Sequence, residues 1–324
     1  MLVLNKEDIK KVYTMEDAVK AAEEAVKTDA ETPLRINFDM PEKNGQALYM
    51  PGYLKGQGIT GIKIVSVFPD NSEKGVPVVP AQVLLLNPET GETAAIIDGT
   101  YLTQVRTGAI QGYATKVLSR EDSKTALVIG TGGQFLSQSE AMLTVRDLET
   151  LYIFDINLEK AEAAAEKARE EFKRFDTEIK AVSSLDDIYD ELDIITTVTT
   201  SKQYTFDGEK VKDGIHVNGV GAYTPEMMEI PPEYFKRTEE LFMDNADGVL
   251  NEAGDVMRAI ESGAIEKDSC FEIREIAEGK KKGRTDDKQN TVFKTVGAAV
   301  LDIVTAWDIY QKALEENVGT EVDI

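Results

Sequence analysis

The stretch Ala126-Leu127-Val128-Ile129-Gly130-Thr131-Gly132-Gly133-Gln134 decides the fold, because it joins an apolar strand to a glycine-rich turn. We expect a helix after the turn that runs to about Asp147. Dinucleotide-binding folds need this order of strand, tight turn and helix, so that the helix N-terminus faces the pyrophosphate. Here Gly130 would make the turn, and Gly132 would let the backbone approach the phosphate. Phe135 stands where the fingerprint has Gly or Ala, which predicts looser packing of the helix on the strand.

An acid at the end of the next strand completes this pattern. Residues 150–154 form an apolar run that closes on Asp155, 23 residues after Gly132. A carboxylate at this point accepts hydrogen bonds from the adenosine ribose and repels a 2′-phosphate. The pattern therefore favours NAD(H) and leaves NADP(H) open as a second cofactor. The alternative is an ordinary strand, turn and helix with a surface Asp and no bound ligand. The succession of strand, turn, helix, strand and acid favours a cofactor site over this alternative.

Strands and helices continue to alternate after this unit. We expect a helix over residues 158–172, strands over 179–182, 192–198, 215–219 and 240–243, and one long helix over 291–314. This alternation predicts an α/β domain with a Rossmann-type, doubly wound parallel sheet covered on both faces. The basic run from Glu278 to Arg284 is expected to be a solvated loop.

The first part of the chain has a different pattern. A strand over residues 2–4 and an amphipathic helix over 14–27 precede short β runs at 47–50, 59–65, 83–86 and 93–97. Residues 101–118 then read as a helix. These runs predict a smaller α+β unit with one mostly antiparallel sheet.

Composition excludes several classes of protein and site. The 324 residues carry a net charge of −23, which argues against nucleic acid as a partner. The one cysteine, Cys270, excludes an intrachain disulfide, and the one histidine, His216, excludes metal sites built on two histidines. We expect no metal, no membrane-spanning segment and no secretory signal, hence a cytoplasmic protein. His216 itself is expected to be a hydrogen-bonded strand residue without a catalytic role.

Three cations occupy apolar or turn contexts in the first part of the chain. Lys63 lies in the strand-like run 61–65, Arg106 lies in the helix over 101–118, and Arg35 follows a proline. Each alone is most simply a snorkelling or surface residue. Together they suggest a pocket for a small carboxylate at the junction of two domains, with Arg as a bidentate fork and Lys as a point charge. A Lys buried beside two Arg side chains should have a lowered pKa.

At these residues the chain resembles the ornithine cyclodeaminase/mu-crystallin family along nearly its whole length. The blocks that carry the resemblance are 49–53, 61–63, 67–71, 98–99 with 102–103, 106–109, 130–134, 218–221 and 291–297. The resemblance implies a homodimer of two-domain subunits. Residues 1–118 with 300–324 would form the α+β substrate and dimerisation domain, and residues 119–299 the NAD(P)-binding Rossmann domain.

The resemblance also implies the site residues. Arg35, Lys63 and Arg106 would hold the substrate carboxylate, Val296 would contact the substrate, and Lys63 would be the catalytic residue. The implied cofactor contacts are Arg106, Thr107, Gly130, Gly132, Gly133, Gln134, Asp155, Asn157, Thr199, Val220, Gly221 and Thr295.

Two departures from the family pattern indicate the subfamily. Ornithine cyclodeaminases carry acids at the positions of Leu48 and Tyr223, and an ammonium in an apolar pocket needs such charges. Their loss favours the ketimine reductase branch. We therefore expect NAD(P)H-dependent reduction of Δ1-pyrroline-2-carboxylate or Δ1-piperideine-2-carboxylate to L-proline or L-pipecolate, with Lys63 as a candidate proton donor or relay. An alanine-dehydrogenase-like enzyme, an ornithine cyclodeaminase and a nucleotide-loaded, mu-crystallin-like binding protein remain the alternatives.

Overall fold

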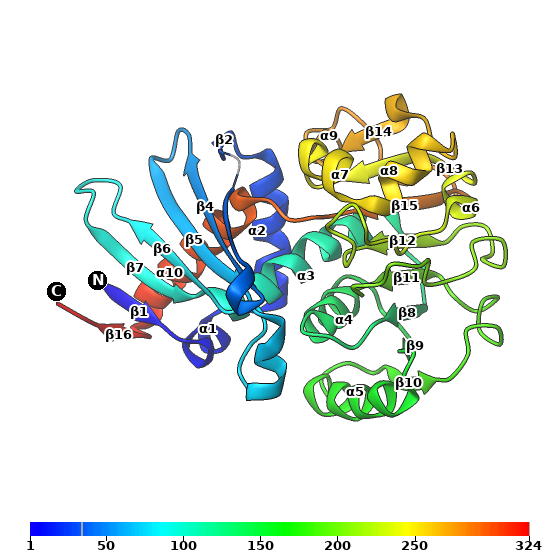
Figure 1. Cartoon of the computed structure of the whole chain (residues 1–324), viewed down its shortest axis with the longest axis horizontal. Helices are drawn as coiled ribbons and strands as arrows, with labels where there is room; N and C mark the ends of the chain where they lie inside the picture. The colour runs from blue at the N-terminus through cyan, green and yellow to red at the C-terminus, as the bar shows by residue number, and fades with distance from the viewer. Residues whose placement is uncertain (34, 324) are drawn as a thin grey trace. The chain divides into compact units, whose positions relative to one another are not determined.

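The structure is a computed structural model that describes residues 1–33 and 35–323 (Figure 1). The chain divides into two compact units: unit 1 is Met1–Arg106 with Ala298–Ile324, and unit 2 is Thr107–Gly297. The first crossing lies inside helix α3 (Gly99–Leu118), whereas the expected domain boundary lay at the end of that helix. Unit 1 is therefore built from both ends of the chain, and unit 2 from one continuous segment.

Unit 1 contains a sheet whose described strands are mostly antiparallel, as expected. Their order is β16-β1-β7-β6-β5-β4-β2, with β3 paired to β4, and β1 and β7 are the parallel pair. The strands are β1 (Leu2–Leu4), β2 (Ala30–Glu31), β3 (Ile36–Met40), β4 (Gly45–Leu54), β5 (Ile59–Val67), β6 (Ala81–Leu86), β7 (Thr93–Asp98) and β16 (Thr320–Glu321).

One face of this sheet is buried beneath helices. Side chains alternate between the faces of a strand, so Leu48 and Met50 of β4 lie on the same face as Val65 and Lys63, their partners on β5. All four are buried, and helix α10 (Ala299–Glu316) packs against β4, β5 and β6 on this inner face. Helix α2 (Met15–Lys27), which begins with a capping box between Thr14 and Asp17, packs against α10. The remaining helical segments are α1 (Lys6–Val12), η1 (Pro41–Lys43) and η2 (Pro69–Lys74).

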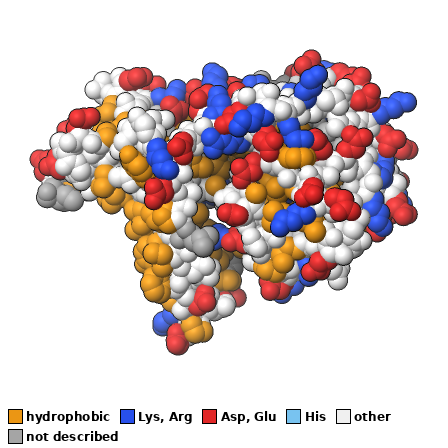
Figure 2. Space-filling model, turned by 90° about the horizontal axis from the view of Figure 1, so that it is seen from above, with side chains coloured by type: hydrophobic (Ala, Val, Ile, Leu, Met, Phe, Trp, Pro, Cys, Tyr) orange, Lys and Arg blue, Asp and Glu red, His pale blue; other side chains and the backbone are white. Residues whose placement is uncertain are grey.

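The other face of the unit 1 sheet is apolar and only partly covered. Register places Ile36 of β3 opposite Tyr49 of β4, and Tyr49 opposite Ile64 of β5. Ile36 is 54% exposed, Phe38 is 58% exposed and Ile64 is 40% exposed. Hydrophobic side chains also gather at the surface of unit 1, at the left of Figure 2. We call the face formed by Ile36, Phe38, Tyr49 and Ile64 the outer face.

Unit 2 contains a sheet in which every described strand pairs in parallel, as the alternation of strands and helices predicts (Figure 1). Its order is β10-β9-β8-β11-β12-β15-β13-β14. The strands are β8 (Thr125–Ile129), β9 (Thr150–Phe154), β10 (Glu178–Val182), β11 (Ile194–Thr197), β12 (His216–Gly219), β13 (Thr238–Met243), β14 (Cys270–Glu272) and β15 (Asn290–Lys294).

Two hydrophobic cores cover the two faces of this parallel sheet. Ala126 and Val128 of β8 belong to one core, and Leu127 and Ile129 belong to the other. Phe135 is only 3% exposed in the first core, so it packs against the sheet in place of the small residue of the fingerprint. The helical segments are α4 (Phe135–Val145), α5 (Leu158–Glu171), α6 (Pro232–Phe235), α7 (Ala246–Glu252), α8 (Gly254–Glu261), η3 (Lys267–Ser269) and α9 (Arg274–Ala277).

The long helix expected over residues 291–314 was wrong in its first part. Residues Asn290–Lys294 form β15, which lies between β12 and β13 and is buried along its whole length. The apolar part of this strand is only Val292 and Phe293, and so short an apolar run does not distinguish a strand from the start of a helix. Gly297, whose φ of +86° is in the left-handed region, separates β15 from α10, which begins at Ala299.

The basic run 278–284 is a loop, as expected, but it is not solvated over its whole length. Glu278, Gly279 and Lys280 are exposed, but Arg284 is half-buried. Its Nε donates to the Leu118 carbonyl at 2.8 Å, and its Nη1 donates to the Gln289 carbonyl at 2.6 Å. Arg284 therefore joins the end of α3 to the segment before β15.

Candidate functional site

The glycine turn of unit 2 follows β8 directly. Gly130 has a φ of +106°, and a Cβ there would lie 2.8 Å from Thr199 Cγ2 and from the Val198 carbonyl oxygen, so the fold itself requires glycine. At Gly132, by contrast, a Cβ would meet no heavy atom of the described chain within 4 Å. Glycine at 132 is therefore not needed for packing. It leaves open the space that a bound pyrophosphate would fill.

The N-terminus of α4 is open as well. Gln134 is its N-cap residue and makes no side-chain capping hydrogen bond. Unpaired amides in the first turn of a helix form a favourable site for an anion. Gly132 and Gly133 are exposed beside this turn. The turn and the helix start together fit the phosphates of a dinucleotide.

Asp155 lies immediately after β9, in reach of the glycine turn. The Thr131 hydroxyl donates to Asp155 Oδ2 at 2.6 Å, and the Asn157 amide donates to Oδ1 at 3.0 Å. The Asn157 side chain accepts from the amides of Glu159 and Lys160, so it caps α5. Asp155 is thus held in place and can accept further hydrogen bonds, whereas the side-chain oxygen of Asn157 already serves the helix.

A buried carboxylate, Glu229, organises the loops after β11 and β12. Its Oε1 accepts from the Thr199 amide at 2.6 Å and from the Thr199 hydroxyl at 2.8 Å. Its Oε2 accepts from the Gly221 amide at 2.7 Å and from the Ala222 amide at 2.9 Å. Glu229 was not predicted from the sequence, although its neighbours Thr199, Val220 and Gly221 were. No local signal distinguishes this Glu from a surface acid.

Lys294 and Asp255 complete a buried charge cluster around Glu229. All three side chains are fully buried, and Lys294 Nζ lies 3.0 Å from Asp255 Oδ2 and 4.0 Å from Glu229 Oε2. Burial raises the pKa of the Glu229 carboxyl, and the Lys294 ammonium opposes this rise. The cluster fixes the carboxyl ends of neighbouring parallel strands, where ligands bind in open α/β sheets.

Thr295 and Val296 lie in the segment between β15 and Gly297. The Thr295 hydroxyl donates to Asp244 Oδ2, which also accepts from the Gly297 amide at 2.9 Å. The Val296 amide lies 3.4 Å from Asp244 Oδ1. Thr295 therefore follows a strand and does not begin a helix, and Asp244 holds the segment in place.

Unit 1 brings two of its three predicted cations together. Lys63 Nζ lies 2.6 Å from Asp302 Oδ2, and Arg106 Nε donates to Asp302 Oδ1 at 2.9 Å. Lys63 is 2% exposed, Arg106 is 6% exposed and Asp302 is fully buried. Arg106 Nη1 is buried and has no hydrogen-bond partner among the described residues. Asp302 of α10 was missed because it lies far along the chain from both cations.

Burial and the neighbouring charges together change the pKa of Lys63. Burial lowers the pKa of Lys63 to about 8, while Asp302 opposes the shift and Arg106 and Arg35 add to it. The lowered pKa was expected, but burial contributes more than the arginines. Arg35 is half-buried before β3 and influences Lys63 through its charge. Two buried cations sharing one carboxylate leave a positive charge and the unpaired Nη1 side of the Arg106 guanidinium, which we call its free edge. Both suit the carboxylate of a ligand.

Comparison with known proteins identifies the family of this chain. The sequence model of the ornithine cyclodeaminase/mu-crystallin family matches residues 1–317. The chain belongs to this family. Within it, the chain is 34% identical to a Δ1-pyrroline-2-carboxylate reductase of Bacillus cereus, over 100% of both chains, and 32% identical to an alanine dehydrogenase of Archaeoglobus fulgidus, over 99% of this chain and 98% of that one.

A solved family structure is also similar to this chain. Thermococcus litoralis Δ1-pyrroline-2-carboxylate reductase in complex with NADH and L-proline superposes with a TM-score of 0.92 and 37% identity, over 99% of this chain and 100% of that one. This likeness confirms the α/β fold expected from the sequence.

Two family positions set this chain apart from the cyclodeaminase pattern. Leu48 is buried on the inner face of the unit 1 sheet, in a small apolar cluster with Met50 and Val65. Tyr223 lies on the loop after β12 and is 40% exposed. Neither position offers a carboxylate for a second ammonium group.

His216 lies outside the family's predicted site residues and serves the fold. It is fully buried at the start of β12, with Nδ1 3.0 Å from Thr291 Oγ1 and Nε2 2.9 Å from Asn218 Oδ1. Burial lowers the pKa of His216 to about 3, and the charge of Arg284 adds to the shift. The expectation of a hydrogen-bonded strand residue is confirmed.

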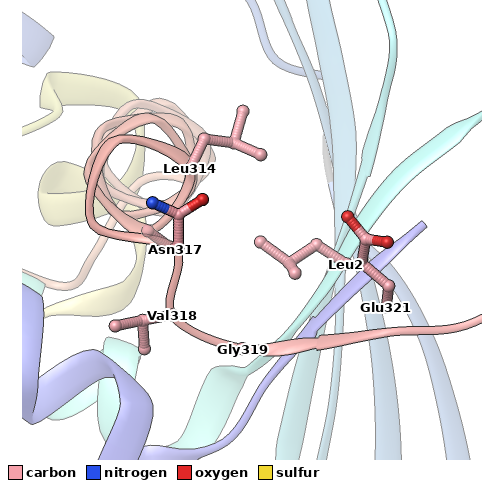
Figure 3. Close-up of a pocket in the computed structure, with 7 residues that line it drawn as sticks. Leu2, Leu314, Asn317, Val318, Gly319 and Glu321 are labelled. Atoms are coloured by element: carbon pink, nitrogen blue, oxygen red, sulfur yellow. The ribbon is translucent and has the colours of Figure 1, made fainter.

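A surface hollow in unit 1 contains none of the predicted family site residues. Figure 3 shows it between the end of α10 and strands β1 and β16, with Leu2, Leu314, Asn317, Val318, Gly319 and Glu321 around it. Its lining lacks a cation, so it does not fit a carboxylate. Among the helices of residues 1–33 and 35–323, none has both the length and the apolar character needed to cross a bilayer.

Proposed function

We propose that this chain is an NADH-dependent reductase of small cyclic imino acids, with Δ1-pyrroline-2-carboxylate as first substrate and L-proline as product. The observation that carries the proposal is the buried pair of Lys63 and Arg106, with Arg106 Nη1 left without a partner in the described chain. The full-length similarity to Δ1-pyrroline-2-carboxylate reductases supports the same substrate class. The six-membered homologue, Δ1-piperideine-2-carboxylate, is the second substrate of this class.

The residues of unit 2 would hold the cofactor. Gly132, Gly133 and Gln134 surround the start of α4, where the phosphates fit, and Asp155 would accept hydrogen bonds from the adenosine ribose. Bound NADH supplies the hydride that reduces the imine carbon. Asp155 favours NADH over NADPH, because its charge repels a 2′-phosphate. Cofactor contacts at Arg106, Thr107, Gly130, Asn157, Thr199, Val220, Gly221 and Thr295 remain predictions.

The residues of unit 1 would hold the substrate. Arg106 and Arg35 grip and orient the carboxylate, which is a contribution of proximity. Lys63 adds positive charge and is a candidate source of the proton for the imine nitrogen, since its pKa of about 8 suits proton transfer near neutral pH. An imine that binds already protonated needs no such donor. Val296 is retained as an apolar substrate contact.

The deciding experiment measures NADH oxidation with Δ1-pyrroline-2-carboxylate and with pyruvate plus ammonia. Release of ammonia and L-proline is measured with L-ornithine, because that reaction consumes no NADH overall. We expect the imino acid to be turned over most efficiently. The alanine dehydrogenase relative makes pyruvate plus ammonia the second candidate. No turnover of any imino acid, with NADH still bound, would favour a binding protein and contradict the proposal.

Arg106→Ala tests the carboxylate grip. A charged hydrogen bond contributes about 1.5–3 kcal/mol, so kcat/KM for the imino acid should fall by about 10- to 200-fold. Arg174→Ala is the control, because Arg174 pairs at the surface with Glu140 and should leave the rate unchanged. Melting temperatures of both variants check that they fold. An unchanged kcat/KM in folded Arg106→Ala would remove Arg106 from the substrate site.

We also propose that the enzyme is a homodimer that works in the cytoplasm. The exposed outer face of the unit 1 sheet, with Ile36, Phe38 and Ile64, supports a second copy as the partner. Cys270 is the one cysteine, and burial raises its pKa to about 11, so it is an inert thiol suited to a reducing compartment.

A further inference from the structure

Asp302 is an unusual acid for its position in α10. It lies in the first turn, where acids commonly interact with the helix dipole or with unpaired amides. Its side chain pairs instead with the two cations Lys63 and Arg106, one on each carboxylate oxygen. The carboxylate is fully buried. Asp302 therefore links a strand, β5, to a helix, α3, through charge.

The hydrogen bond between Arg106 and Asp302 determines which side of the guanidinium remains available to a ligand. The carboxylate takes the Nε edge at 2.9 Å, and Nη1 has no partner in the described chain. Arg binds carboxylates through a planar fork, so fixing one edge orients the other. The orientation of the free edge thus depends on Asp302.

Asp302 also acts on the charge of Lys63. Burial disfavours the ammonium, and the cations Arg106 of α3 and Arg35 before β3 disfavour it further. Asp302 of α10 is the anion that opposes these effects. Without it, Lys63 would lie in a buried site among positive charges only.

We propose that Asp302 is a positioning residue, which orients the free edge of Arg106 and keeps Lys63 protonated for a ligand carboxylate. This inference rests on the proposed function for its ligand class. It adds a residue that makes no contact with substrate and acts through two residues that do.

The test measures the affinity of pyrrole-2-carboxylate, a planar analogue of the product, as a function of pH by calorimetry. Wild-type binding should weaken as pH rises through about 8, because Lys63 loses its charge. In Asp302→Asn this loss should occur at a pH lower by about one unit or more, since an adjacent opposite charge shifts a pKa by about 1–3 units. An unshifted profile in Asp302→Asn would overturn the proposal.

Three further variants separate positioning from stability. Asp308→Asn is the matched control: Asp308 is a half-buried acid on the same helix that is not among the charges acting on Lys63, and its loss should leave the pH profile in place. In Lys63→Met the loss of affinity at high pH should disappear, both in the single variant and in combination with Asp302→Asn. In Asp302→Glu the affinity should still be lost near the wild-type pH, because the negative charge remains. The affinity itself should be several-fold lower, because the longer side chain displaces Arg106. If Asp302→Asn does not fold, wild-type affinity in Asp302→Glu would overturn the proposal.

Binding needs no turnover, so the two proposals can fail separately. A shifted profile in an enzyme that reduces no imino acid would uphold the role of Asp302 and remove the proposed reaction. A wild-type protein that binds no pyrrole-2-carboxylate at any pH would overturn both.

Discussion

His216 is an example of how one buried side chain links the fold to pH. The folded state holds His216 neutral with a pKa of about 3, whereas an unfolded histidine has a pKa of about 6.5. Between these two values only the unfolded chain takes up this proton. We therefore expect His216 to reduce the free energy of unfolding by about 1.4 kcal/mol per pH unit as pH falls below about 6.

His216→Gln provides the measurement for this effect. Glutamine does not titrate, so the variant should lose stability at pH 7 and yet depend less steeply on pH between about 6 and 4. Urea unfolding at several pH values gives both slopes. The carboxylates that also titrate in this range are common to both proteins. Equal slopes in the two proteins would show that His216 is not held neutral.

The roles of the acids Asp302 and Glu229 could not be predicted from the sequence. The glycines, Asp155, Lys63 and Arg106 were found because each lies in a local pattern or a family block. Asp302 pairs with cations 239 and 196 positions away, and Glu229 binds amides of two separate loops. Such partners become neighbours only after the strands have aligned, so no local sequence pattern predicts these contacts.

At the scale of elements, the glycine turn separates the needs of the fold from those of a ligand. Gly132→Ala should change the free energy of unfolding by no more than about 0.5 kcal/mol, because open space surrounds its Cβ position. The added methyl group should nevertheless weaken NADH binding about tenfold or more by occupying the phosphate space. Fluorescence titration with NADH measures this loss.

Gly130→Ala is the contrasting variant. Its φ of +106° and its close approach to Thr199 and Val198 predict a loss of about 2–4 kcal/mol in stability. Denaturant unfolding of both variants checks the contrast. A Gly132→Ala protein that binds NADH as wild type does would exclude the phosphates from this turn.

Elements with a local signature were predictable, and β15 was not. Strands β8 and β9 and helix α5 agree with their expected ranges within about a residue, because turn residues bound them. The segment 290–294 is buried on both faces and leads to α10 after a short link, so periodicity alone merged the two. The short helices α1, α7 and α8 lacked a long periodic pattern and were missed.

At the scale of the whole molecule, the outer face of unit 1 determines the expected assembly. Phe38→Asp places a charge on a face with Ile36 and Ile64, where a second copy would bury it. An unpaired buried charge costs about 3 kcal/mol or more, so the dimer should dissociate about 100-fold more readily. Analytical ultracentrifugation measures the dissociation.

Leu158→Asp is the control for this change. Leu158 is 41% exposed at the start of α5 in unit 2, where an acid suits the helix N-terminus. It should leave the assembly unchanged. A wild-type protein that sediments as a monomer, or Phe38→Asp protein that dimerises as wild type does, would exclude this face as the interface.

The discontinuity of unit 1 has a consequence for synthesis on the ribosome. Strands β4 to β6 emerge early, but α10, which covers their inner face, follows more than 200 residues later, after all of unit 2. Unit 2 is continuous and emerges complete before α10 does. Leu48, Met50 and Val65 therefore stay without their helix cover until α10 has been synthesised, and Lys63 meets its counter-charge Asp302 only then.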